Sequence, residues 1–200
     1  MFIALTQRLE KNKNYNEMRE ILAQDWGLFF QKNLSNFLPL PLSFEIPFEN
    51  YSNKIKAVIL TGGNDLSIFN PSEENIVRDN YEKDLIQHSI HFKMPILAVC
   101  RGAQLLAYYF KSEIKKIENH VGNHFVKDIE NRIFEVNSFH HYAITKLGKS
   151  LKPCAWAEDK TIEAFCHKAL PFYAIMWHPE RENGLNNTNI LKTFLSEIKK

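Results

Sequence analysis

The strongest indication of the fold is one stretch near the middle of the chain, Met94-Pro95-Ile96-Leu97-Ala98-Val99-Cys100-Arg101-Gly102-Ala103-Gln104-Leu105-Leu106-Ala107. Its apolar run, Ile96 to Val99, has the length and branching of a strand buried on both faces. Good helix formers follow Gly102, so Cys100 stands where a buried strand turns sharply into a helix. That is the geometry of a nucleophile elbow, in which the helix N-terminus favours thiolate over thiol. The alternative is a small, inert core cysteine.

Two other stretches supply what a cysteine nucleophile needs. Ala174 to Trp177 reads as an apolar strand that ends at His178, and Glu180 follows two residues later. A base must take the thiol proton and return it to the leaving group, and a carboxylate must orient that base. Ala57 to Leu60 is a second buried strand, and it runs into the pair Gly62-Gly63. A glycine there lets a backbone N–H approach a substrate oxygen, as an oxyanion hole requires.

Taken together, these motifs resemble a known family. Cys100-Arg101-Gly102-Ala103-Gln104, Trp177-His178-Pro179-Glu180 and Thr61-Gly62-Gly63-Asn64-Asp65 are similar to the motifs of the class I glutamine amidotransferase superfamily. Within it, the sequence most resembles the gamma-glutamyl hydrolase branch, which includes gamma-glutamyl-gamma-aminobutyrate hydrolases. Matches to that branch are Arg78-Asp79 with Glu82, Asn137-Ser138-Phe139-His140-His141 and Ile162-Glu163-Ala164.

The resemblance implies a fold, a reaction and a set of site residues. The fold is a doubly wound, flavodoxin-like α/β domain with a mostly parallel central sheet and helices on both faces. The reaction is hydrolysis of a gamma-glutamyl amide through a glutamyl-thioester, with no cofactor and no metal. Cys100, His178 and Glu180 are the catalytic residues, and the backbone N–H groups of Gly63 and Arg101 form the oxyanion hole. Gln104, His140, His141 and Tyr142 line the glutamyl pocket.

Several of these assignments have alternatives. Gln104 could cap the helix or face solvent, and His140 and His141 could merely support their loop. The Arg101 side chain could reach an anionic substrate. Arg78, Asp79 and Glu82, with Asp65, are expected to form a salt-bridge cluster that shapes a loop. Glu163 is expected to be structural, and Cys154 and Cys166 to be inert.

His120 and His124 flank Val121-Gly122-Asn123, which makes zinc binding conceivable. No cysteine or carboxylate at suitable spacing completes a ligand set, however. We therefore expect these two histidines to have a structural role or to lie at the rim of the substrate site.

Composition limits the class of protein. Two hundred residues suit a single domain spanning 1–200, and a formal charge of +2 provides no electrostatic case for nucleic acid. Three cysteines without CxxC spacing argue against a disulfide framework. No apolar segment reaches the ~20 residues of a membrane helix, and the N-terminus does not read as a signal peptide. We expect a soluble, cytoplasmic protein that acts on a small molecule, while its oligomeric state is left open.

The periodicity predicts the remaining elements. Strands are expected at 2–5, 37–44 (an edge strand, because Pro39 and Pro41 interrupt it), 114–117, 125–126, 133–136, 151–157, 161–165 and 172–177. Helices are expected at 17–32, 81–92 and 188–198, and loops at 6–16 and 67–75.

The leaving amine and the wider function stay open at this stage. Tyr142, Lys160 and the short 110–121 region depart from the branch pattern on the leaving-group side. Candidate substrates are gamma-glutamyl-gamma-aminobutyrate, gamma-glutamyl polyamines, folate polyglutamates and nucleotide adducts. The chain also resembles the hydrolases of capsule phosphoramidate synthesis in campylobacters, which implies gamma-glutamyl-CDP-amidate. The alternatives are a glutaminase subunit that delivers ammonia to a separate synthase, and a non-catalytic α/β binding or stress-sensor protein.

Overall fold

Five parallel strands form the centre of the molecule. The computed structural model describes residues 1–117 and 120–199. The strands run in the order β4 (Leu38–Pro41), β1 (Phe2–Leu5), β5 (Ile55–Leu60), β6 (Ile96–Val99) and β13 (Phe172–Ile175). Each neighbouring pair is parallel. All four residues of β6 are buried, which confirms the strand predicted from its apolar run.

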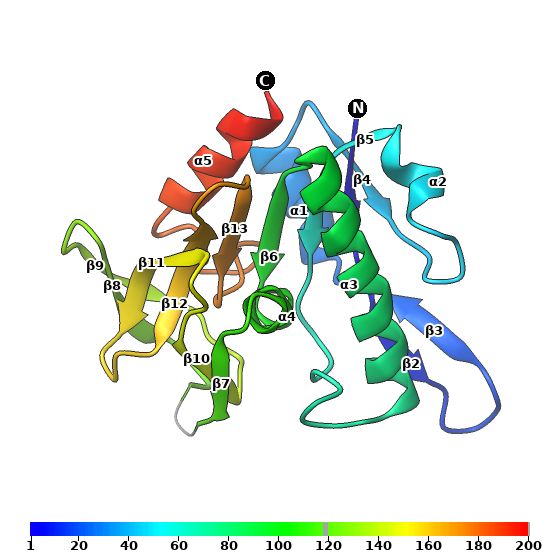
Figure 1. Cartoon of the computed structure of the whole chain (residues 1–200), viewed down its shortest axis with the longest axis horizontal. Helices are drawn as coiled ribbons and strands as arrows, with labels where there is room; N and C mark the ends of the chain where they lie inside the picture. The colour runs from blue at the N-terminus through cyan, green and yellow to red at the C-terminus, as the bar shows by residue number, and fades with distance from the viewer. Residues whose placement is uncertain (118–119, 200) are drawn as a thin grey trace.

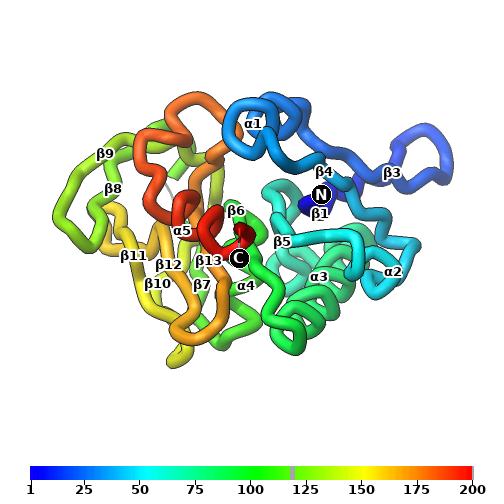
Figure 2. Tube along the Cα trace, turned by 90° about the horizontal axis from the view of Figure 1, so that it is seen from above, coloured from blue at the N-terminus to red at the C-terminus, as the bar shows by residue number. Residues whose placement is uncertain are grey.

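Helices cover both faces of this sheet (Figures 1 and 2). Helices α3 (Glu73–Phe92) and α4 (Arg101–Tyr109) lie on one face, and α1 (Asp25–Asn33) and α5 (Asn189–Ile198) lie on the other. Side chains alternate along β6, so Ile96 and Ala98 join one core cluster and Leu97 and Val99 join the other. The predicted doubly wound α/β architecture is therefore confirmed.

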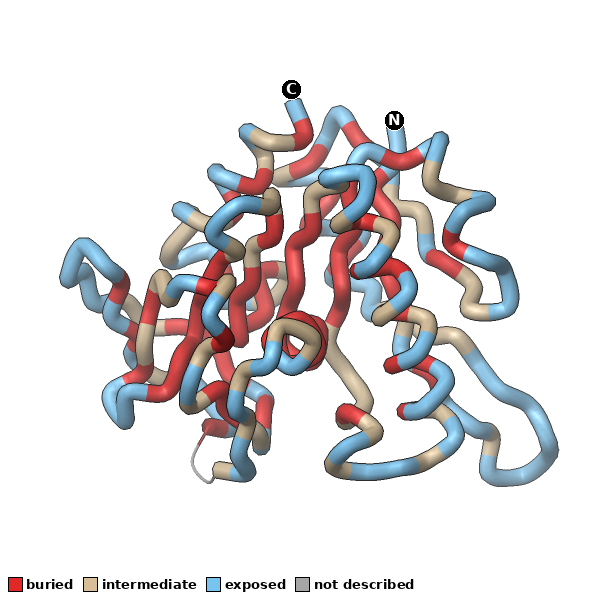
Figure 3. The backbone as a smooth tube through the Cα atoms, in the orientation of Figure 1, coloured by how far each residue is buried: buried red, intermediate tan, exposed pale blue. Residues whose placement is uncertain are grey.

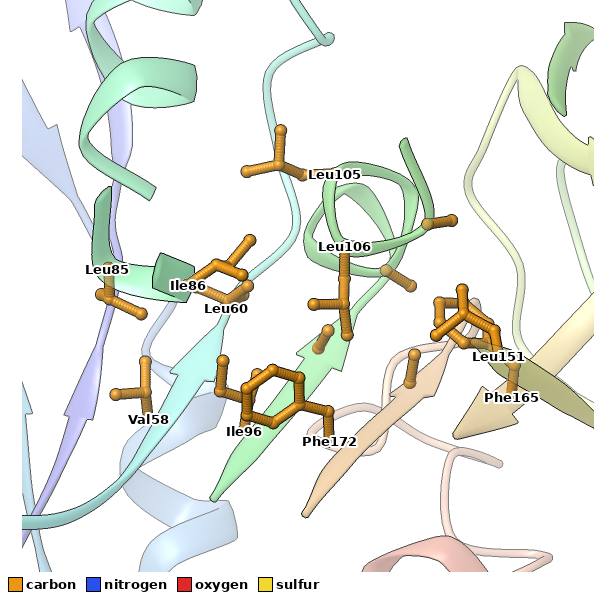
Figure 4. Packing of buried hydrophobic residues seen from close by; sticks show 14 of the residues in the cluster. Val58, Leu60, Leu85, Ile86, Ile96, Leu105, Leu106, Leu151, Phe165 and Phe172 are labelled. Atoms are coloured by element: carbon orange, nitrogen blue, oxygen red, sulfur yellow. The ribbon is translucent and has the colours of Figure 1, made fainter. Parts of the chain in front are cut away.

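Burial concentrates in the central strands and on the sheet-facing side of the helices (Figure 3). Figure 4 shows one of the two cores, where Leu106 of α4 points toward Leu60, Ile96 and Phe172 of the strands. Because both faces of β6 are packed in this way, its C-terminal end is held rigidly.

The second half of the chain extends the sheet with antiparallel strands. β12 (Ile162–His167) pairs with β13, and β11 (Leu151–Ala157), β8 (His124–Asp128) and β9 (Ile133–Val136) follow in that order. β10 (Tyr142–Lys146) pairs with β12 and with β7 (Glu113–Lys116), which completes an 11-stranded sheet. The β-rich second half was predicted, although β10 itself was not.

The prediction for the first forty residues is wrong in part. The predicted 6–16 loop and the start of the 17–32 helix are instead a hairpin of β2 (Arg8–Lys11) and β3 (Met18–Ile21), and α1 begins only at Asp25. The spacing of apolar residues in 17–24 fits a helix. In the structure, the backbone N–H and C=O groups of this segment pair instead with the strand at 8–11. The Asn64 side chain also holds β2, because it hydrogen-bonds to both the N–H and the C=O of Leu9.

Two other helices differ from expectation. α3 begins eight residues before the predicted start, because the Ser72 hydroxyl caps it by accepting a hydrogen bond from the Asn75 N–H at 3.3 Å. A short helix, α2 (Glu49–Ser52), was not predicted. In residues 1–117 and 120–199, no helix combines the length and the apolarity needed to span a bilayer.

Candidate active site

Cys100 occupies a strained turn between β6 and α4 (Figure 1). Its φ of 52° and ψ of −109° lie in a region that side chains other than glycine rarely adopt. The Cys100 N–H donates to the Ile175 carbonyl at 2.9 Å, and the Cys100 carbonyl accepts from the Gln104 N–H at 3.0 Å. A Cβ on Gly102 would lie 2.3 Å from the Leu60 carbonyl oxygen, so only glycine fits at this position in the first turn of α4. This is the predicted elbow.

His178 lies just beyond the end of β13 and is held by two neighbours. Its Nδ1 lies 2.8 Å from Oε1 of Glu180, and both side chains are buried. The Asn137 side chain accepts from the His178 N–H at 2.9 Å and donates to the His178 carbonyl at 2.9 Å. Burial lowers the pKa of His178, but Cys100 and Glu180 beside it raise that pKa more, to about 9. Cys100 and Glu180 thus favour the imidazolium form of His178.

Cys100 and His178 both lie close to Gly62, which shows how near they are to each other. A Cβ built on Gly62 would lie 3.4 Å from Cβ of Cys100 and 3.5 Å from Nε2 of His178. Cys100 and Nε2 of His178 thus lie close to the same point beside Gly62. The structure brings together the three predicted catalytic residues, Cys100, His178 and Glu180.

The turn that carries Gly63 is fixed from behind by Arg78, which is fully buried. The Arg78 guanidinium donates to the carbonyl oxygens of Thr61, Gly62 and Gly63 at 2.8, 3.0 and 2.6 Å. A trans peptide directs its C=O and N–H to opposite sides. Binding of the Gly62 carbonyl by Arg78 therefore turns the Gly63 N–H away from Arg78, as the predicted oxyanion role requires.

Arg101 is tied to the same network. Its guanidinium is buried and forms ion pairs with Asp79 and Glu82, and Glu82 also accepts from Arg78 Nε at 2.9 Å. Burial raises the pKa of Glu82, but Arg101 and Arg78 lower it more, so this carboxyl stays ionised. The side chain of Arg101 is therefore unavailable to an anionic substrate, which corrects that expectation. Its backbone remains at the first position of α4.

The expected salt-bridge cluster is present, but one of its residues differs from the prediction. Arg101 replaces Asp65 in it, since no ion pair in residues 1–117 and 120–199 involves Asp65. The four charges connect the loop after β5 to the helix that follows Cys100. The two predicted oxyanion residues are consequently held by one buried network.

The four predicted pocket residues lie on one segment and one helix. The Gln104 side chain is buried and donates to the Tyr142 carbonyl at 3.0 Å. The Tyr142 ring stacks on Phe69 with centroids 4.0 Å apart and planes 8° from parallel. His141 is exposed, whereas His140 is buried and directs Nε2 toward Glu163 at 3.5 Å.

Sequence reasoning missed the neighbours of Glu163. The structure places His120, His124 and His140 around this carboxylate, although Glu163 follows His124 by 39 residues. The sequence signals were that His140 and Glu163 fall within family-like motifs and that His120 and His124 lie four residues apart. Cys154 and Cys166 lie with their sulfurs 3.6 Å apart, well separated in sequence from the elbow.

A small cavity of about 140 Å³ opens beside His178. Its lining includes Gly62, Gly63, Trp26 and two arginines, Arg8 and Arg181. The hairpin that the sequence did not predict delivers Arg8 here, where its side chain packs over Gly63. The cavity therefore brings two cationic side chains, Arg8 and Arg181, beside His178 and Gly63.

Comparison with known proteins agrees with this geometry. Residues 35–198 match the family model described as Glutamine amidotransferase class-I. The chain is 54% identical over 200 residues to the gamma-glutamyl-CDP-amidate hydrolase of Campylobacter jejuni subsp. jejuni serotype O:2, and the match covers 100% of both chains. It is 32% identical over 152 residues to one subunit of the glutamine-hydrolyzing GMP synthase of Pyrococcus furiosus, covering 70% of this chain and 74% of that one. A glutamine amidotransferase structure from Thermotoga maritima superposes with a TM-score of 0.65 at 18% identity, covering 99% of this chain and 82% of that one.

Proposed function

The chain belongs to the class I glutamine amidotransferase family, and we propose that it hydrolyses the gamma-glutamyl amide bond of a small conjugate to release glutamate and the amine. The observation that carries this proposal is the 54% identity, over the whole length of both chains, to a gamma-glutamyl-CDP-amidate hydrolase. The convergence of Cys100 and His178 above Gly62 supplies a matching chemical apparatus. We take gamma-glutamyl-CDP-amidate as the first substrate to test.

Before the first step, the thiol proton of Cys100 has passed to His178. The Cys100 thiolate then attacks the gamma-carbonyl carbon, and the carbonyl electrons move onto oxygen. The N–H groups of Gly63 and Arg101 stabilise that oxyanion. When the tetrahedral intermediate collapses, the C–N bond breaks and His178 gives its proton to the leaving nitrogen. The raised pKa of His178, about 9, keeps that proton available at neutral pH.

In the second step, His178 is neutral and takes a proton from a water molecule as the water attacks the thioester. The C–S bond breaks, glutamate leaves, and the sulfur and the imidazolium are regenerated. Glu180 stabilises the imidazolium throughout, because its Oε1 lies 2.8 Å from Nδ1. Water is the only co-reactant, and the proton count balances.

The leaving-group side of the site suits a diphosphate. Arg8 covers Gly63, and Arg181 lies 4.8 Å from the ring centroid of Phe139, while its Nε lies 3.8 Å from Glu180 Oε1. Both arginine side chains are partly exposed, at 48% and 36%, so a ligand can reach them, although Arg8 also pairs with Glu10 at 3.2 Å. Arginine forks match phosphate oxygens well, whereas glutamine carries no such group.

The test measures glutamate release from gamma-glutamyl-CDP-amidate, gamma-glutamyl-gamma-aminobutyrate and glutamine. We expect the nucleotide conjugate to have the highest kcat/KM, and Cys100→Ala to abolish turnover while the circular dichroism spectrum is retained. A glutamine-analogue alkylator should label Cys100 and spare the other two cysteines. An active Cys100→Ala variant would contradict the proposal.

Charge-removing variants test the leaving-group assignment. Arg8→Gln and Arg181→Gln should each raise KM for the nucleotide conjugate about 10-fold, the loss of one charge-assisted contact, and change kcat/KM for glutamine much less. Arg19→Gln is the matched control, because it removes a cation from the same hairpin away from the cavity. Equal losses on both substrates would refute the assignment.

A glutaminase subunit is the second candidate, favoured by the 32% identity to part of a glutamine-hydrolyzing GMP synthase. It requires glutamine to be the best substrate, and activity to rise when a synthase partner is added. The same substrate panel distinguishes the two candidates.

A further inference from the structure

A second polar cluster is buried behind the catalytic histidine. It comprises His120, His124, His140 and Glu163, which come from the segment before β8, the start of β8, the segment before β10 and β12. Nδ1 of His120 and Nε2 of His140 each lie 3.5 Å from Oε1 of Glu163. Nε2 of His124 lies 3.4 Å from Oε2 of Glu163. The Glu163 side chain is fully buried, and even the most open of the histidine side chains, His124, is only 17% exposed.

These contacts are too long for ordinary hydrogen bonds, which span roughly 2.7–3.2 Å. Within residues 1–117 and 120–199, the three facing nitrogens and both Glu163 oxygens have no hydrogen-bond partner. Buried polar atoms normally have one, so a group of five without any needs an explanation.

The outer nitrogens determine the protonation of two of these rings. Nε2 of His120 lies 3.0 Å from the Asp159 carboxylate, and Nδ1 of His140 lies 3.1 Å from the Tyr142 carbonyl. Both partners only accept, so each of these outer nitrogens carries the hydrogen. In the neutral rings, the inner nitrogens of His120 and His140 therefore direct lone pairs toward a carboxylate oxygen. That arrangement is repulsive unless a cation lies between them.

We propose that His120, His124, His140 and Glu163 bind one divalent first-row transition-metal ion. Zinc bonds of about 2.0–2.2 Å to nitrogen and oxygen, at tetrahedral angles, separate neighbouring ligand atoms by roughly 3.3–3.5 Å. Nδ1 of His120 and Nε2 of His140 both lie 3.5 Å from Oε1 of Glu163, which matches that value for one shared oxygen. Nε2 of His124 lies 3.4 Å from the other oxygen, Oε2, so the ion would contact both oxygens of Glu163. The candidate ligand atoms of His120, His124 and Glu163 all lie within 4.8 Å of one another, so metal binding would draw the histidines slightly together.

The outer contacts are those that a metal site uses. A metal-bound histidine usually donates its other ring N–H to a carboxylate or a backbone carbonyl, as His120 does to Asp159 and His140 does to Tyr142. Three imidazoles and one carboxylate favour zinc, cobalt or nickel over magnesium or calcium, which prefer oxygen ligands. Four protein ligands leave no open position, so the site is structural rather than catalytic.

The ion would brace the segment that holds His178. His140 is three residues after Asn137, whose side chain fixes both backbone polar groups of His178. Ser138 donates from its hydroxyl to the His120 carbonyl at 2.6 Å, and the Gly122 N–H donates to the Ser138 carbonyl at 2.9 Å. Metal binding thus joins two irregular segments to β12, one of which positions the catalytic base.

The first experiment measures metal directly on the wild-type protein after removal of any histidine tag. We expect about one equivalent of zinc by mass spectrometry of the purified protein, or calorimetric binding of one equivalent of Zn²⁺ to chelator-treated protein. Proton release should accompany binding, since the ligands must be deprotonated. Excess Zn²⁺, but not Mg²⁺, should raise Tm by on the order of 5–10 °C. Co²⁺ should give the visible bands of a tetrahedral site without thiolate charge transfer, which excludes binding by the cysteines.

Variants then identify the ligands. Glu163→Gln and His124→Gln should each weaken Zn²⁺ binding at least 100-fold, and Asp159→Asn about 10- to 100-fold through His120. His91→Gln, an exposed histidine on α3, is the control and should bind normally.

Two results would overturn the proposal. One is wild-type protein that binds no Zn²⁺ at micromolar free concentration. The charge of Glu163 would then be balanced by protonated histidines rather than by a metal ion. The other is unchanged Zn²⁺ affinity in folded Glu163→Gln or His124→Gln. Neither result bears on the hydrolase proposal, which depends on Cys100 turnover.

Discussion

Gly62→Ala tests the geometry of the site through one added methyl group. The new Cβ would lie 2.7 Å from Cε1 of His178, and the imidazole must withdraw by about 0.7 Å to restore a 3.4 Å contact. Displacement of a catalytic group by about 1 Å costs about 100-fold in rate, so we expect kcat/KM to fall roughly 30- to 100-fold. Stability should change little, because the methyl group presses on a side chain rather than on backbone.

The assay is glutamate release, with Tm measured beside it. Gly27→Ala in α1 is the matched control, because a Cβ there meets nothing within 4 Å and should leave activity unchanged. Gly102→Ala is the opposite control, because its Cβ would lie 2.3 Å from the Leu60 carbonyl oxygen and should lower Tm. If Gly62→Ala keeps more than a third of the wild-type kcat/KM, the deduced convergence of Cys100 and His178 is wrong.

Three further predictions concern the base and the pocket. His178→Ala should lose several orders of magnitude in rate and Glu180→Gln less, because Glu180 orients rather than transfers a proton; the reverse order in equally folded variants would contradict these roles. Because the pKa of His178 rises from 6.5 to about 9 on folding, its contribution to the free energy of unfolding is complete below about pH 6.5 and is lost as pH rises through about 9. Denaturant titrations of wild type and Glu180→Gln between pH 6 and 10 measure this, and parallel curves would refute it. Tyr142→Ala, which removes the stack on Phe69, should change the ranking of amide substrates more than the rate on glutamine, and a uniform loss across the panel would speak against a specificity role.

Local sequence was sufficient where local forces decide the structure. The apolar run of β6 and the strand-forming residues of β9 and β11 predicted those strands with bounds close to the observed ones, and the helix formers after Gly102 predicted α4. The hairpin of β2 and β3 was mispredicted because apolar residues in 17–24 fit a helix equally well. Only pairing with a second strand decides between the two conformations.

The positions of some site residues could likewise be predicted from sequence, and the positions of others could not. Cys100, His178 and Gly63 follow parallel strands, and carboxyl ends of neighbouring parallel strands meet at one edge, so their convergence could be predicted. The position of the Arg101 side chain could not be predicted, because its ion pairs with Asp79 and Glu82 form only when α3 packs against α4.

Local sequence is enough to predict the doubly wound core and the sharp turn at Cys100, because strand burial, helix propensity and steric crowding act between near neighbours. The approach of His124 to Glu163 depends instead on the tertiary structure. They belong to β8 and β12, which do not pair with each other, and each pairs with β11 between them. That sheet order is set by pairing and burial over the whole domain, and no local pattern around either residue contains it.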